Sequence, residues 1–296
     1  MAYTYQAPKD LEAQSAAFKR QYPTLEALYA TQQYEVQPKY DGVFSAVYTG
    51  RHALSRQGEL QLSAAHIVEE LASLLPGKEL VVFMELWIPE EAHKKINGLA
   101  RKQSVQTNLQ GAVFDFTPLE NLKGGVCTIP YMERKLFLRE ALQKAETCFV
   151  ANSLVVRPEK EGYFVNLANE LKAHATNAYD GIILRNTEAP WRPGAVKQGE
   201  VLRVKPGMTV DVMCIGQSAE QRATKLGGFL TVEYFGKPTD VGSGLNQKHL
   251  QGIMDGSLDF RGKVIEVECL GITPDGRLRE PRFKSVRHDT KREEDK

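Results

Sequence analysis

The sequence lacks long apolar runs, paired cysteine motifs and any marked excess of charge. No stretch approaches the ~20 apolar residues that a membrane-spanning helix needs, so we expect no membrane partner. The four cysteines, Cys127, Cys148, Cys214 and Cys269, are scattered without a CxxC pair, which argues against a zinc module and a disulfide framework. The first residues, MAYTYQAPKDLEAQ, show no basic-then-apolar leader, so we expect a cytoplasmic protein. The net charge of +1 means that any basic surface must arise by local segregation.

The first two hundred residues mix strand and helix patterns. Apolar, β-branched runs such as Val43–Thr49 and Leu80–Leu86 predict strands, and we also expect a short strand at Leu154–Val156. Helical periodicity is present at Ala64–Leu75, and Asp10–Tyr22 reads as a helix that stops before a proline. This alternation predicts an α+β domain built on antiparallel sheets over residues 1–206.

The pattern changes after Pro206-Gly207. Val210–Ile215, Phe229–Phe235 and Val264–Leu270 are strand-like and are separated by glycine-rich turns. Short strands of this kind over residues 207–296 predict a small all-β Greek-key barrel of the OB type, although any small β domain fits such turns.

The tetrapeptide Lys39-Tyr40-Asp41-Gly42 places a lysine at a strand-to-turn corner. A lysine is a nucleophile only after losing its proton, which neighbouring cations or desolvation favour. Arg203 and Lys205 are two apart on a predicted strand, so they share one face and could supply both that field and a phosphate contact. Taken alone, each string also fits exposed surface cations.

Two carboxylates and one aromatic residue complete the candidate chemistry. Glu85 interrupts the apolar strand VVFMELW and needs a partner, because an unpaired buried charge is costly. Asp180 begins a second strand, and Mg²⁺ prefers a few carboxylates together with phosphate oxygens. Phe114 could stack on a base, or it could be a core phenylalanine.

The order of these motifs resembles that of the covalent nucleotidyltransferases, the polynucleotide ligases and mRNA capping enzymes. The matching strings are KYDG, EL-W at Glu85 to Trp87, FDF at Phe114 to Phe116, DGIILR at Asp180 to Arg185 and LRVKP at Leu202 to Pro206. VGSGL at Val241 to Leu245 and TPDGRLREPRF at Thr273 to Phe283 are similar to the barrel domain of DNA ligases. The chain therefore resembles a compact, bacteriophage-type ATP-dependent DNA ligase.

The resemblance implies an adenylation (nucleotidyltransferase) domain at 1–206 and an OB-fold domain at 207–296. It implies nick sealing through a covalent lysyl-AMP and an adenylylated 5′-phosphate, with nicked duplex DNA as partner and a monomeric protein. ATP and Mg²⁺ would be the cofactors, with Mn²⁺ as an alternative ion. The absence of a four-cysteine zinc module favours ATP over NAD.

Family roles carry over residue by residue. Lys39 falls on the nucleophile, with Lys205 and Arg203 as the other catalytic cations, and Asp180 with Glu85 as the metal ligands. The nucleotide contacts are Gln37, Lys39, Arg56, Glu85, Phe114, Arg185, Arg203, Lys205 and Arg287. The DNA contacts we expect are basic residues in both domains: Lys94, Lys95, Arg101, Lys102, Arg277, Arg279, Arg282 and Lys284.

The chain departs from the family pattern at several positions. Phe44 stands where ligases usually carry the arginine of KxDGxR, and Arg56 or Arg185 would have to compensate. Gln37 replaces a usual glutamate, and we expect its amide oxygen to accept from the adenine amino group. The terminal RxDK motif appears as Arg287-His288-Asp289-Thr290, which affects lysine self-adenylylation most.

Two other functions stay open on the sequence. An RNA ligase or capping guanylyltransferase shares the lysine chemistry and is weakly favoured by Phe44, but the TPDGRLREPRF string counts against it. A non-catalytic nucleic-acid-binding protein could retain the same core. Transfer of label from ATP or GTP to protein, and then to DNA or RNA, distinguishes the three.

Overall fold

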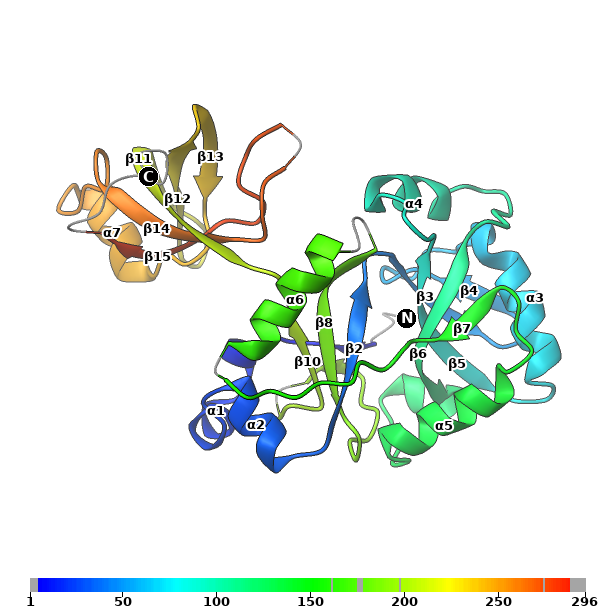
Figure 1. Ribbon diagram of the computed structural model, residues 1–296. Coiled ribbons are helices and arrows are strands. Elements are labelled where there is room, and N and C mark those ends of the chain that lie inside the picture. The colour runs from blue at the N-terminus through cyan, green and yellow to red at the C-terminus, as the bar shows by residue number, and fades with distance from the viewer. Residues whose placement is uncertain (1–4, 161, 175–177, 197, 274, 288–296) are drawn as a thin grey trace. The chain divides into compact units, whose positions relative to one another are not determined.

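The computed structural model of the 296-residue chain describes residues 5–160, 162–174, 178–196, 198–273 and 275–287 (Figure 1). The chain divides into two compact units, Met1–Lys205 and Pro206–Lys296. Residues 288–290 of the terminal RxDK motif lie outside the described residues.

The larger sheet of the first unit has five strands in the order β4-β3-β5-β6-β7. All pairs are antiparallel except the parallel pair β6–β7. The strands are β3 (Val43–Tyr48), β4 (His52–Leu54), β5 (Leu80–Trp87), β6 (Gln110–Pro118) and β7 (Cys148–Val150).

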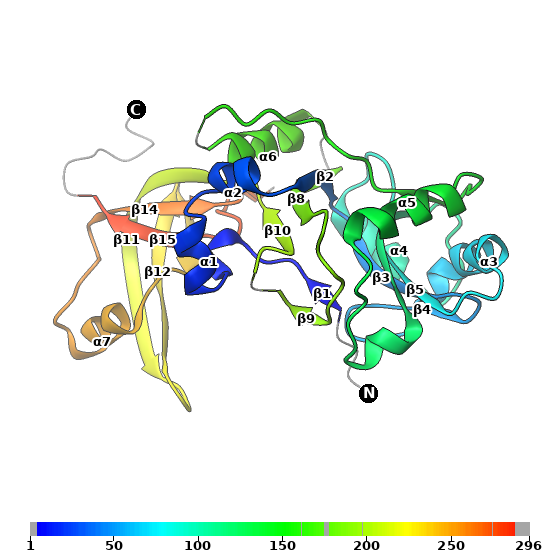
Figure 2. The same ribbon diagram turned by 90° about the horizontal axis from the view of Figure 1, so that it is seen from below.

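Three helices, α3 (Ala65–Leu74), α4 (His93–Ala100) and α5 (Tyr131–Ala141), pack against this sheet (Figure 2). Their apolar residues share one core with the central strands, because residues spaced by three or four lie on the same face of a helix. The fully buried members of that core include Ile67, Leu71, Val82, Met84, Ile96 and Leu138.

A second sheet joins β10, β8 and β2, in that order and antiparallel throughout. Its strands are β2 (Tyr34–Tyr40), β8 (Tyr179–Asn186) and β10 (Val201–Val204), and α2 (Leu25–Thr31) and α6 (Tyr163–His174) contribute to the core on one face. Alternation in β2 and β8 sends one set of side chains into that core. The other set, which includes Lys39, lies on the opposite face.

Two expectations about the first unit are wrong. The helix predicted over Asp10–Tyr22 is interrupted: a 3₁₀ turn, η1 (Leu11–Ala13), precedes α1 (Ala16–Gln21), because the Ser15 hydroxyl accepts from the Phe18 amide at 3.2 Å and caps a new helix. Leu154–Val156 is not a strand. Leu154 makes a single bridge to β2, and Val155 is 93% exposed, so no neighbouring strand extends the pairing.

The second unit is a five-stranded antiparallel sheet in the order β13-β12-β11-β14-β15. Its strands are β11 (Met208–Gln221), β12 (Leu226–Tyr234), β13 (Lys237–Val241), β14 (Val264–Cys269) and β15 (Arg282–Val286).

The two edges of this sheet meet. Ser243, just beyond β13, forms a parallel bridge to Arg282 of β15, and the Phe283 amide donates to the Ser243 carbonyl at 2.9 Å. The sheet thus closes around an apolar core, as the predicted OB barrel requires. The domain is not all-β, however. Asn246 caps a helix, α7 (Gln247–Asp255), between β13 and β14.

The cysteines lie in the apolar interior of the two units. All four cysteines are buried and unpaired, which agrees with a role as small apolar residues. Among the described residues, no helix is long and apolar enough to cross a membrane.

Candidate active site

Lys39 and Asp180 meet where β2 and β8 come together. The β2–β8 register shifts between Pro38 and Tyr40, and Lys39 lies at that irregularity. Its Nζ donates to Asp180 Oδ1 at 2.6 Å, and the two side chains are 23% and 14% exposed. The lysine is therefore accessible, but its position is fixed by one carboxylate.

Lys205 follows β10 and lies beside Gly181 of β8. Pro38, Ile182 and Val204 form one row across the three strands, and Lys39 and Lys205 are the residues that follow Pro38 and Val204. The Cα atom of Lys205 lies 3.1 Å from where a Cβ of Gly181 would sit. Gly181 has a φ of 136°, and a Cβ there would lie 2.2 Å from the Val204 carbonyl oxygen. A glycine is required for this close approach of the strands.

Glu85, on β5, is the second carboxylate of the site. Burial raises the pKa of its carboxyl to about 7, while the nearby Lys39 and Arg56 oppose the rise and Asp180 and Asp41 add to it. Lys39 and Asp41 belong to one tetrapeptide, whereas Arg56 and Asp180 come from other parts of the sequence, and all four act electrostatically on Glu85. Gly42 permits the approach of β5, since a Cβ there would lie 2.4 Å from the Leu86 carbonyl oxygen.

The raised pKa of Glu85 predicts a pH-dependent stability. The folded protein holds the Glu85 proton more tightly than the unfolded chain, whose usual pKa is 4.5. Protonation of Glu85 therefore adds to the free energy of unfolding. This addition is fully present below pH 4.5 and is lost as the pH rises through about 7. Glu85→Gln, which stays neutral, should gain stability relative to the unmodified protein between pH 5 and pH 8. The urea unfolding midpoints of both proteins, measured across this pH range, test the prediction. If the midpoints of the two proteins differ by the same amount at every pH, the raised pKa of Glu85 is wrong.

Arg56 is held at the site by two aromatic rings. Its guanidinium carbon lies 5.0 Å from the Tyr5 ring centroid and 5.6 Å from that of Phe44, in the range of cation–π contacts. The Tyr5 and Phe44 rings are themselves 4.7 Å apart. Position 44 therefore lacks the arginine that ligases usually carry there, but the Phe44 ring packs against Arg56.

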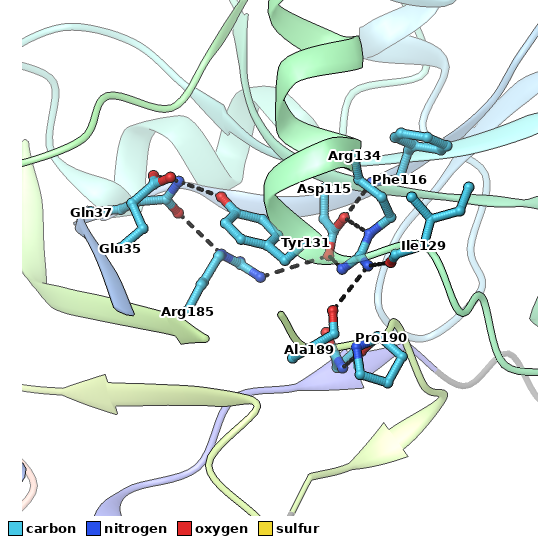
Figure 3. A network of polar contacts seen from close by, with 11 residues as sticks. Glu35, Gln37, Asp115, Phe116, Ile129, Tyr131, Arg134, Arg185, Ala189 and Pro190 are labelled. Carbon is cyan, nitrogen blue, oxygen red and sulfur yellow. Dashed lines mark hydrogen bonds and ion pairs between the residues drawn. The ribbon is translucent and has the colours of Figure 1, made fainter. Parts of the chain in front are cut away.

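Gln37 and Arg185 were predicted to contact the nucleotide, but both belong to a buried polar network (Figure 3). Gln37 is 2% exposed, and its Nε2 donates to Glu35 Oε1 at 2.7 Å and to the Tyr131 hydroxyl at 2.8 Å. Its Oε1 accepts from Arg185 Nε at 3.0 Å, so the oxygen proposed for adenine already has a donor. Arg185 is equally enclosed, and its guanidinium lies 4.8 Å from the Phe114 ring centroid.

The network continues through buried ion pairs. Arg134 donates from Nε and Nη2 to the two oxygens of Asp115, at 2.7 Å and 3.0 Å, and from Nη1 to the Ala189 carbonyl at 3.1 Å. Glu35 accepts from Lys135, whose burial lowers the pKa of its ammonium. These contacts join α5 to β6 of the larger sheet and to β2 of the second sheet.

Phe114 is half-buried on β6, with Arg185 packed against its ring. Arg203 lies on β10, and Lys205 directly follows the last residue of that strand, Val204. Arg203 forms a bidentate pair with Asp10 at 2.6 Å and 3.1 Å, so the charge of its guanidinium is largely offset.

Arg287 belongs to the second unit. It donates to Asp211 Oδ1 at 3.1 Å and to Glu266 Oε1 at 3.0 Å. The predicted nucleotide contact of Arg287 requires that these two ion pairs exchange for phosphate oxygens.

Two residues that no motif identified approach the Asp41 carboxylate. His93, the first residue of α4, places Nδ1 3.5 Å from Asp41 Oδ1, and Lys172 of α6 places Nζ 3.9 Å from Oδ2. The Asp41 amide donates to the Ala178 carbonyl at 3.0 Å, which fixes its backbone. Helices α4 and α6 thus flank the site, and each contributes a basic side chain.

The predicted DNA-contacting cations are divided between the two units. Lys94 and Lys95 are exposed on α4, and Arg101 and Lys102 follow it. In the second unit, Arg282 and Lys284 share the outer face of β15, Arg277 pairs with Asp275, and Arg279 lies in the preceding loop.

The described part of the chain holds no group of three or more histidine, cysteine or acidic side chains that could bind a metal. It does offer Asp180 and Glu85 close to Lys39. Mg²⁺ usually takes one or two protein carboxylates together with phosphate oxygens and waters, so two carboxylates fit a metal that arrives with a nucleotide.

Several solved structures share the fold of this chain. No protein-family model matches the sequence, and no curated sequence does. Among solved structures, the chain named Pmar-Lig_PreS3 is 17% identical, with a TM-score of 0.71 over 96% of this chain and 67% of that one. A Lig E DNA ligase, described as binding DNA with a minimal scaffold, is 16% identical, with a TM-score of 0.67 over 97% of this chain and 100% of that one.

The ATP-dependent DNA ligase from bacteriophage T7, in complex with ATP, is 16% identical, with a TM-score of 0.54 over 96% of this chain and 98% of that one. Each similarity spans both units of the present chain. The chain therefore has the fold of the compact ATP-dependent DNA ligases, a nucleotidyltransferase domain followed by an OB-fold domain.

Proposed function

We propose that this chain is an ATP-dependent DNA ligase that seals nicks in duplex DNA. The observation that carries the proposal is the convergence of Lys39, Asp180, Glu85, Arg56 and Lys205 at one site, although they come from motifs spread over most of the first unit. A ligase fold alone would not establish the chemistry, because one fold can serve several functions.

In the first step, Lys39 Nζ attacks the α-phosphorus of ATP. An N–P bond forms, the bond from phosphorus to the bridging oxygen breaks, and pyrophosphate leaves with that electron pair. Asp180 holds the ammonium at 2.6 Å before reaction and is placed to receive its proton. Lys205, beside Gly181, and Arg56 provide positive charge for the phosphate oxygens, the usual requirement of phosphoryl transfer.

Asp180 and Glu85 would hold Mg²⁺ together with the nucleotide phosphates. The ion would neutralise the phosphate charge that develops during transfer. Neutral Glu85 is a weak ligand, so occupation of the site should favour its ionised form.

The two remaining steps take place at the same site. The 5′-phosphate of the nick displaces Lys39 from AMP, which gives an adenylylated DNA end. The 3′-hydroxyl then attacks that 5′-phosphorus, and AMP leaves. Phe114 would stack on the adenine ring, and the Arg185 guanidinium packs against the same phenylalanine at 4.8 Å from its ring centroid.

Transfer of radioactive label tests the proposal. The full chain is incubated with Mg²⁺ and either α-labelled ATP or α-labelled GTP, and then receives nicked DNA or nicked RNA. Label should pass from ATP to protein, then to nicked DNA, and should be released as AMP while the strand is joined. Labelling by GTP would instead indicate a capping-type enzyme, and no labelling by either nucleotide would refute covalent catalysis.

DNA contact by the second unit should be directed to phosphates and independent of sequence. Arg282 and Lys284 are both exposed on β15, and Lys284 pairs only at the surface, 3.2 Å from Glu268. Each phosphate that a cation neutralises contributes about −0.9 to the slope of log affinity against log salt. The Arg282→Ala, Lys284→Ala double variant should flatten that slope by about two units for all duplexes alike.

The salt series should include Arg222→Ala as a matched control. Arg222 is also an exposed arginine of the second unit, paired with Glu220, and lies outside the predicted DNA surface. An unchanged slope in the double variant would move the DNA surface elsewhere.

A further inference from the structure

The sealing step needs a proton acceptor of its own. In the first step the attacking group is Lys39, which already faces Asp180 at 2.6 Å. In the second step the attacking group is a phosphate oxygen, which carries no proton that must leave. In the third step the attacking group is a hydroxyl, and its proton must be transferred as the new O–P bond forms.

Asp41 and His93 form a carboxylate–imidazole pair beside the site. His93 Nδ1 lies 3.5 Å from Asp41 Oδ1 and 3.4 Å from the Asp41 carbonyl oxygen, so both Asp41 acceptors lie on the Nδ1 side of the ring. The Asp41 carboxylate is only 10% exposed, whereas His93 is 45% exposed. An orienting carboxylate on one ring nitrogen leaves the other, Nε2, to exchange a proton with substrate.

His93 also begins the helix that carries some of the expected DNA contacts. It is the first residue of α4, whose next residues, Lys94 and Lys95, are exposed cations. Lys172 of α6 approaches the other oxygen of Asp41 at 3.9 Å, and Glu85 on β5 acts electrostatically on Asp41. The charged groups that act on the carboxylate facing the imidazole are thus Lys172 and Glu85.

The other carboxylates of the site are less suited to this task. Asp180 is bonded to Lys39, and both Asp180 and Glu85 are the groups proposed to hold a metal with the nucleotide. Neither has a ring nitrogen that can take a proton while a partner carboxylate stabilises the resulting cation. Imidazole is the side chain that populates both protonation states near neutral pH.

We propose that His93, oriented by Asp41, accepts the proton of the DNA 3′-hydroxyl in the sealing step. The O3′–P bond forms, the bond between that phosphorus and the AMP oxygen breaks, and AMP leaves with the electron pair. The hydroxyl proton passes to His93 Nε2 and then to solvent. This assignment rests on the proposed ligase function and adds a catalytic residue outside the recognised motifs.

The test isolates the last step. A nicked duplex that already carries AMP on its 5′-phosphate is mixed with excess full-length enzyme, without ATP, and strand joining is followed in a single turnover. His93→Ala and His93→Gln should each seal about 100-fold more slowly than the unmodified protein, a loss typical of a missing general base. Both variants should still form lysyl-AMP at the normal rate. Added imidazole should restore part of the sealing rate to His93→Ala.

His52→Ala is the matched control, because it removes another partly exposed histidine of the first unit, one that packs against the Tyr48 ring at 4.8 Å between ring centroids and lies outside the expected nucleotide and DNA contacts. It should leave both lysyl-AMP formation and sealing unchanged and show no response to imidazole. Asp41→Asn tests the positioning role: it should slow sealing of adenylylated DNA more than it slows lysyl-AMP formation, and added imidazole should not restore the rate, because the His93 ring is still present but no longer oriented.

Two results would overturn the proposal. One is normal sealing of adenylylated DNA by His93→Ala. The other is an equal loss in all three steps without rescue by imidazole, which would make His93 a structural or DNA-binding residue. If the unmodified protein itself neither takes label from ATP nor joins adenylylated DNA, the ligase function fails instead, and the two failures are therefore distinguishable.

Discussion

Lys39→Ala should take up no label from α-labelled ATP, because the atom that forms the bond to phosphorus is gone. Lys39→Arg should be equally inactive, since a guanidinium keeps the positive charge beside Asp180 but does not lose its proton at neutral pH. The loss should exceed a thousandfold in single-turnover adenylylation, the scale of effect seen when a covalent nucleophile is removed.

Lys78→Ala provides the matched control, because Lys78 is an exposed lysine of the same unit, far from any motif. It should adenylylate normally. Both Lys39 variants should unfold at nearly the temperature of the unmodified protein, because Lys39 is partly exposed and its ion pair adds little stability. Labelled adenylate on Lys39→Ala protein would mean that another residue is the nucleophile.

Asp115→Ala should cause the largest loss of stability among substitutions in the first unit that leave the surface unchanged. Asp115 and Arg134 are 2% and 1% exposed and are joined by two hydrogen bonds (Figure 3). Removing one partner leaves a buried guanidinium uncompensated, which costs about 3–5 kcal/mol. Urea unfolding of both proteins measures the loss.

Glu79→Ala breaks a comparable pair at the surface and serves as its control. Arg51 and Glu79 are 2.6 Å apart, but their side chains are 52% and 71% exposed, so the expected change is below about 1 kcal/mol. Equal effects in the two variants would contradict a structural role for the buried pair. A secondary effect on ATP binding is expected for Asp115→Ala, because the network packs behind Phe114 through Arg185.

Sequence motifs identified the proposed reacting groups but not the residues that hold them in place. Lys39, Asp180 and Glu85 could be predicted because each interrupts a local pattern, a strand end or an apolar run, in a chemically recognisable way. Gln37 and Arg185 have the alternation that puts them on the same face as Lys39, yet alternation does not say what covers that face. Their partners, Tyr131 and Asp115, come from α5 and β6, about 70 to 95 residues away from Gln37 or Arg185.

Two features were missed for different reasons. Helix α7 had readable signals, since Asn246 and His249 form a capping box and Gly256 ends the helix in the left-handed conformation, but the many turns around it suggested an all-strand domain. His93 carries no local signal of function. Only the path of the chain from β5 to α4 brings it back to Asp41, fifty-two residues earlier.

The two motif glycines have a consequence for experiments that map function by mutational tolerance. Gly42 and Gly181 each face a neighbouring backbone carbonyl, at 2.4 Å and 2.2 Å from where a methyl group would sit. A saturation library scored for strand joining would therefore rank both glycines beside Lys39, although neither has a side chain to offer the substrate. Scoring the same library for yield of folded protein separates the two classes: the glycine variants disappear from the soluble pool, and the Lys39 variants remain in it.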